Sequence, residues 1–176
     1  MVRTLADGSS TTFLAPAKTK QELQAQIDDH LRRFPGGVQI NENEISYKGG
    51  SFVMTFAKPN SPQSRNMGTQ GTNDCPWGWY CFWDGTSFTY PRGRLSDCGW
   101  QDLYDFGWHD RTESVAQTLG SPTYVLYIGH EGSTPNHSGD DVYFFTDSAK
   151  KTISAVPVDF RNSADHANQN CPLLTE

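Results

Sequence analysis

The chain has 176 residues, enough for one sizeable core or two small ones. Its net charge of −6 argues against nucleic acid as a partner, because binding to the phosphate backbone needs a basic face. Its mean hydropathy is −0.64, and no apolar run approaches the roughly 20 residues of a membrane helix, so no membrane insertion is expected.

The first 57 residues predict an arm followed by a small αββ unit. The arm, residues 1–18, is small and polar and contains no signal peptide, because it lacks an apolar segment. Thr19 begins a helix through a capping box with Glu22, and Pro35-Gly36-Gly37 ends it. The apolar stripe on this helix must cover either the main domain or another chain. Its residues are Leu23, Ile27, Leu31 and Phe34.

Two strands are predicted after the helix, at residues 38–47 and 51–56, joined by a hairpin at Lys48-Gly49-Gly50. A stretch without periodicity, rich in Pro, Ser, Asn, Gly and Gln, then predicts a linker. The expected divisions are the arm (1–18), the αββ unit (19–57), the linker (58–73), the main domain (74–168) and a tail (169–176).

Residues 74–114 hold three of the four cysteines and all five tryptophans. Aromatic residues alternate with a period of two on both sides of a strand at residues 79–83, as expected in a sandwich. The predicted fold is therefore mostly β. Most tryptophans are expected in the core, while Trp77 and Trp108, which are flanked by turn residues, are the predicted exposed ones.

The cysteines predict disulfides, because none shows the paired spacing of a zinc site. They are Cys75, Cys81, Cys98 and Cys171, with Cys171 expected to fasten the tail. Three pairings are open. Disulfides imply that the protein is extracellular or lies on the surface of a virion or other particle. The chain is then expected to be either a mature form or a protein that leaves the cell without a signal peptide.

Residues 75–103 read CPWGWYCFWDGTSFTYPRGRLSDCGWQDL. This run resembles the βγ-crystallin-like domain of the streptomycete metalloproteinase inhibitor family, peptidase inhibitor family thirty-six, in its Cys-Pro-x-Gly-x-x-Cys opening, its aromatic hairpin and its Asp-Cys-Gly-Trp-Gln-Asp-Leu strand. Residues 24–56 resemble the family's leader region, so the similarity covers roughly residues 21–168. It implies a sandwich of two Greek keys, with a second half that starts near Tyr124, and peptidase inhibition.

Domains of the kind that this run resembles often bind calcium, through a loop of the form Asn/Asp-Asn/Asp-x-x-Ser/Thr-Ser. In residues 109–114, Asp110 and Ser114 fit this pattern, whereas His109 and Glu113 depart from it. The counterpart, residues 161–166, departs further. Because calcium needs several oxygen ligands from one loop, neither calcium nor any other cofactor is expected.

No catalytic constellation is found in the sequence. His130-Glu131 lacks the second histidine that a helical zinc site needs, and neither a Gly-x-Ser-x-Gly motif nor a glycine-rich phosphate loop occurs. The chain is therefore expected not to be an enzyme.

The favoured function is that of an exported inhibitor that blocks a protease cleft with a rigid loop. Two loops are candidates: residues 89–93, with Tyr90, Pro91 and Arg92, and residues 129–141, with His130 and Glu131. The alternative is a decoration or cement protein of a virion or surface assembly, which would dock on neighbouring subunits through the helix stripe or the arm. A weaker alternative is a carbohydrate-binding module that uses the exposed aromatic residues.

Overall fold

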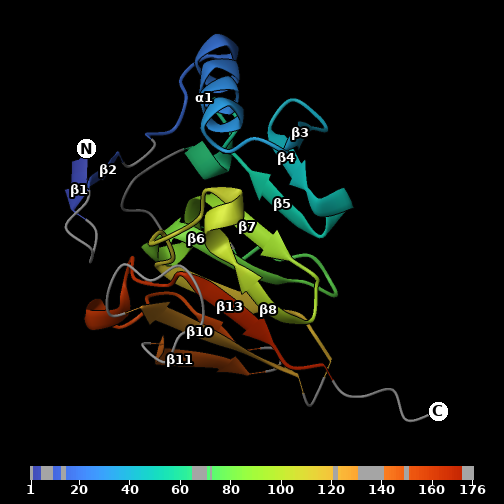
Figure 1. Cartoon of the computed structure of the whole chain (residues 1–176). Helices are drawn as coiled ribbons and strands as arrows, with labels where there is room; N and C mark the ends of the chain where they lie inside the picture. The colour runs from blue at the N-terminus through green and yellow to red at the C-terminus, as the bar shows by residue number, and fades with distance from the viewer. Residues whose placement is uncertain are drawn as a thin grey trace.

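The computed structural model describes residues 2–4, 10–12, 15–64, 71, 73–120, 123–130, 141–148 and 151–171. These residues contain one α-helix, thirteen strands and several short 3-10 helices, which confirms the mostly β class (Figure 1). Strands β1 (Val2–Thr4) and β2 (Ser10–Thr12), in the predicted arm, pair as a small antiparallel sheet of their own. In the part of the chain described, no helix has the length and apolar character needed to cross a membrane.

The helix α1 (Lys20–Arg33) begins as predicted, because the Thr19 side chain accepts a hydrogen bond of 3.1 Å from the backbone N–H of Glu22. Its apolar stripe faces the core of its own chain. Leu23 and Ile27 are buried, and Leu31 and Phe34 pack partly buried against the same cluster. The prediction that this stripe docks on a neighbouring subunit is therefore wrong for the buried pair, because Leu23 and Ile27 are only 3% and 0% exposed.

The larger sheet has seven strands in the order β12-β9-β6-β7-β5-β4-β3. The bounds are β3 (Val38–Gln39), β4 (Glu44–Tyr47), β5 (Phe52–Thr55), β6 (Tyr80–Gly85), β7 (Thr89–Leu95), β9 (Ser114–Gln117) and β12 (Thr152–Ile153). The predicted hairpin joins β4 to β5 through a 3-10 turn at Lys48–Gly50. The predicted first strand, residues 38–47, is instead two antiparallel strands, because the backbone N–H of Asn43 bonds to the side chain of Asn41 and turns the chain.

Strand β5 pairs with β7, so the strands of the αββ segment extend the sheet of the main domain. Two or three short strands cannot bury both faces by themselves, and this pairing gives them a shared core. Gly93 in β7 lies against the ring of Phe82 on the neighbouring strand β6, and a Cβ at this position would collide with that ring.

The smaller sheet has four antiparallel strands in the order β11-β10-β13-β8. They are β8 (Gly99–Asp102), β10 (Tyr124–His130), β11 (Asp141–Ser148) and β13 (His166–Gln169). Short 3-10 helices occupy Pro62–Ser64, Thr86–Phe88, Leu103–Phe106 and Val158–Phe160. Figure 1 shows α1 at one end of the molecule and β10 and β11 at the other.

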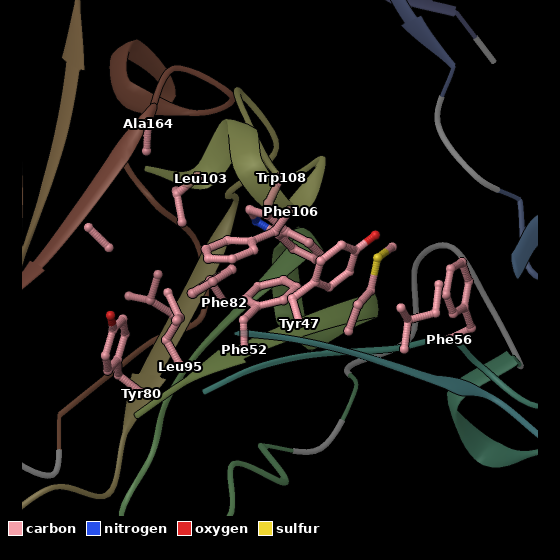
Figure 2. Close-up of a cluster of buried hydrophobic side chains, with 14 of the residues drawn as sticks. Tyr47, Phe52, Phe56, Tyr80, Phe82, Leu95, Leu103, Phe106, Trp108 and Ala164 are labelled. Atoms are coloured by element: carbon pink, nitrogen blue, oxygen red, sulfur yellow. The ribbon is translucent and has the colours of Figure 1, made fainter. Parts of the chain in front are cut away.

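One apolar cluster takes side chains from α1 and from both sheets, and it includes Trp108 (Figure 2). The rings of Phe52 and Phe106 stack within it at 4.2 Å. The prediction that Trp108 is exposed is wrong, since its exposed fraction is 0%. Its indole N–H donates to Thr112 Oγ1 at 3.2 Å, which satisfies the buried nitrogen. The turn residues beside Trp108 correctly predict a turn of the backbone, but they do not show that the indole ring points into the core.

A second cluster lies on the other face of the larger sheet. Its buried members are Ala57, Cys81, Trp83, Phe88, Tyr90 and Ala116. Both faces of β6 and β7 are consequently apolar and covered.

Candidate functional site

The most exposed aromatic side chain of the described residues is carried by a closed loop at residues 75–81. A disulfide joins Cys75 to Cys81 with a Cα–Cα distance of 5.7 Å. The side chain of Trp77 at the tip is 75% exposed, which confirms its predicted exposure. Gly78 follows with a φ of 82°, a left-handed conformation that glycine adopts without steric cost, so the tip is a tight turn.

Hydrogen bonds hold this loop on both sides of its tip. The side chain of Thr118 donates to the carbonyl oxygen of Pro76, and its backbone N–H donates to that of Trp79 at 3.0 Å. The backbone N–H of Cys75 bonds to the side chain of Asn73 at 3.2 Å. The guanidinium of Arg94 lies 5.0 Å above the ring of Trp79, which fixes the base of the loop.

The predicted reactive segment, residues 89–93, is not a loop but part of strand β7. Tyr90 and Arg92 are each 5% exposed, and Pro91 is buried as well, so none of them can enter a partner's cleft. The prediction is wrong because the Pro and Gly of this segment lie within a strand that is covered on both faces.

Tyr90 and Arg92 instead support the Trp77 loop from inside. Arg92 Nη1 donates to both the carbonyl and a carboxylate oxygen of Asp74, each at 2.7 Å, and the hydroxyl of Tyr90 donates to the other carboxylate oxygen. Asp74 directly precedes Cys75, so this partly buried network fixes the start of the loop. Sequence reasoning missed Asp74, and the only available signal was an acidic residue next to the disulfide.

The second predicted loop, residues 129–141, lies mostly outside the described residues. Strand β10 ends at His130, whose backbone pairs with Asp141, while Glu131 is not among the residues described.

The four cysteines form two disulfides, as predicted, and the pairing that the sequence left open is now defined. The second disulfide joins Cys98 to Cys171 with a Cα–Cα distance of 5.6 Å. It fastens the tail beside the start of β8, in agreement with the expected role of Cys171.

A charged cluster forms at the start of the calcium-loop candidate, residues 109–114. The two ring nitrogens of His109 contact two carboxylates, Asp110 through Nδ1 at 3.1 Å and Asp165 through Nε2. Burial alone would lower the pKa of His109, but these two hydrogen-bonded carboxylates outweigh it and raise the pKa to about 10. The ring is therefore an imidazolium at neutral pH. The link to Asp165 was missed because the partners are far apart in sequence.

The cluster has the donor atoms of a metal site, since one ring nitrogen and two carboxylate oxygens lie within 4.8 Å of one another. A mixed nitrogen and oxygen set suits zinc or a similar transition metal better than calcium, and such an ion would have to displace the proton of the imidazolium. Ser114, the other calcium candidate, is buried and donates to the carbonyl of Gly85 at 2.7 Å. Its hydroxyl closes a turn beside β6.

No protein-family model matches the chain, and no curated protein matches it.

Proposed function

We propose that the chain is a non-enzymatic binding protein of the peptidase-inhibitor type, which inserts Trp77 into a hydrophobic pocket of its partner. The observation that carries this proposal is the exposure of Trp77, at 75%, on a loop closed by a disulfide. Large aromatic side chains dominate binding energies at protein interfaces.

The rigidity of the loop supports the proposal. A loop already fixed by Thr118, Asp74 and the Cys75–Cys81 disulfide loses little conformational entropy when it binds. The partner can therefore be held through a small contact area.

The conformation of the loop favours a blocking mode. A substrate-like inhibitor presents an extended, exposed segment to the protease, whereas Trp77 and Gly78 form a tight turn with Gly78 at φ 82°. Residues 89–93 are extended but buried. We propose accordingly that Trp77 fills a pocket beside or within the protease cleft and that no peptide bond of this loop is presented for cleavage.

Two disulfides are compatible with a protein that works in an oxidising, extracellular setting. The seven-stranded and four-stranded sheets, which share one apolar core, would serve as the rigid frame for the loop. A role in decorating a virion or surface assembly has less support, because the core of the same chain already covers Leu23 and Ile27 of the helix stripe.

The test is a titration of the oxidised protein against thermolysin-type and subtilisin-type proteases, with wild type and Trp77→Ala compared. We expect inhibition at near-stoichiometric amounts and a loss of affinity of at least about thirtyfold, roughly 2 kcal/mol, in Trp77→Ala. Tyr143→Ala is the matched control, since Tyr143 is also exposed, at 63%, but lies on β11.

Mass spectrometry of the same mixtures checks the blocking mode. The loop should remain intact while the protease is inhibited, and one slow cut between residues 75 and 81 would show substrate-like inhibition instead. Equal inhibition by wild type and Trp77→Ala would refute the role of the loop. If no protease is inhibited, changes in tryptophan fluorescence on addition of glycans would favour a carbohydrate-binding module.

A further inference from the structure

A layer of polar side chains lies inside the molecule, between the two sheets. Tyr80 on β6 and Gln117 on β9 are direct neighbours in the larger sheet. In the smaller sheet, Asp147 on β11 is opposite Val125 on β10, and Tyr127 follows two residues after Val125. Because residues two apart on a strand share a face, Asp147 and Tyr127 point to the same side as Val125, which belongs to the core.

One hydrogen bond and the electrostatic influence on Tyr127 connect members of this layer. The amide nitrogen of Gln117 donates to the backbone carbonyl of Asp147, which joins the two sheets at this point and leaves the amide oxygen of Gln117 for another contact. Burial raises the pKa of the Tyr127 hydroxyl well above its ordinary value, and the nearby Asp147 and Tyr80 raise it further. Figure 2 shows Tyr80 at the opposite end of the core cluster from Phe56.

Five oxygen atoms of this layer have no hydrogen-bond partner among the described residues. They are the hydroxyl oxygens of Tyr80 and Tyr127, the amide oxygen of Gln117 and both carboxylate oxygens of Asp147. The exposed fraction is 0% for Tyr80, Tyr127 and Asp147 and 2% for Gln117, so bulk water does not reach them. Buried polar atoms left unpaired in this way are costly, and native proteins pair them with a ligand or ordered water.

The charge of Asp147 is the main cost. Buried carboxylates are normally paired with a cation or bound to a metal. Burial raises the pKa of Asp147 to about 7, and the opposing effect of the charge on Lys151, which is exposed, is smaller. Within the described part of the chain, no ion pair to the Asp147 carboxylate is formed.

We propose that Asp147, Tyr127, Tyr80 and Gln117 form an internal binding site for a sodium ion, which links the two sheets. An all-oxygen set of neutral and anionic donors suits a hard cation. The single carboxylate balances a single positive charge, whereas a calcium site draws on several carboxylates in most proteins.

Thermal unfolding of the full, oxidised chain in sodium chloride and in choline chloride of equal ionic strength tests the site. At one fixed pH, each tenfold rise in sodium above its dissociation constant should raise the unfolding midpoint by about 3–5 °C relative to choline.

Two substitutions at the site and one elsewhere complete the test. Asp147→Asn keeps the shape and removes the charge, and Tyr127→Phe removes one ligand oxygen. Both should abolish or weaken the sodium effect, while Asp105→Asn, whose side chain is 51% exposed, should keep it. Identical midpoints in sodium and choline, or an undiminished sodium effect in Asp147→Asn, would overturn the proposal. An equal shift with calcium but not sodium would overturn the assignment of a monovalent ion.

Discussion

Asp110 and Asn162 occupy reciprocal positions in two turns that face each other. Both have left-handed backbones, with φ of 53° and 54°. The backbone N–H of Asp110 donates to Ala164 O at 3.2 Å, and that of Asn162 donates to Thr112 O at 3.2 Å. The acceptor of Asp110 is thus the residue two positions after Asn162, and the acceptor of Asn162 is the residue two positions after Asp110. Two reciprocal backbone hydrogen bonds therefore join the turns at residues 109–114 and 161–166.

The first prediction concerns the left-handed backbone at Asn162. Asn162→Ala should lower the free energy of unfolding by about 2 kcal/mol. A side chain other than Asn or Asp is strained in the left-handed conformation, and the hydrogen bond of 2.9 Å from Asn162 Nδ2 to Glu113 is lost. Asn162→Gly relieves the backbone and should cost about 1 kcal/mol. Urea denaturation of the three proteins measures both values. Equal stability of the Ala and Gly variants would show that the backbone at this position is not strained.

The second prediction is a pH dependence that arises from His109. Its pKa is raised from 6.5 to about 10 in the folded protein by its contacts with Asp110 and Asp165. The folded state therefore binds the proton more tightly than the unfolded state, so the stabilisation is fully present below pH 6.5 and is lost as the pH rises towards 10. In His109→Gln, the unfolding midpoint should fall less steeply between pH 6.5 and about 10 than it does in the wild type. An unchanged slope in that variant would assign the fall to other groups.

Local features of the fold could be predicted from the sequence, whereas pairings between distant segments could not. The capping of α1 by Thr19, the hairpin after β4 and the exposure of Trp77 follow from short-range rules. The pairing of β5 with β7 and the contact of His109 with Asp165 depend on segments that meet only in the folded chain.

Burial explains the main error at the candidate site. A period of two separates the faces of a strand but does not tell which face meets solvent. Because both faces of β7 are covered, Tyr90 and Arg92 are internal supports of the Trp77 loop and not its contact surface.

The third prediction separates the two disulfides. The Cys98–Cys171 bond spans 73 residues and the Cys75–Cys81 bond only 6. In the chain-entropy model, replacing both members of the long pair by Ser should cost about 4 kcal/mol of stability, and replacing both members of the short pair about 2 kcal/mol. The short pair should matter more for binding, because it holds the loop of Trp77. Unfolding and partner titration of the two double variants measure both effects, and a larger loss of binding in the Cys98/Cys171 variant would contradict this division.

The fourth prediction concerns the role of the apolar stripe of α1. Ile27 is 0% exposed and contributes to the core, so Ile27→Ala should lower the free energy of unfolding by about 2–5 kcal/mol. Leu31 is only partly buried, and Leu31→Ala should cost less. If the stripe instead served to dock on another subunit, Leu31→Ala would reduce self-association in sedimentation experiments while leaving the stability of the monomer unchanged. A stability loss in both variants, larger for Ile27→Ala and with no change in association, is the result expected of a helix that completes the core of its own chain.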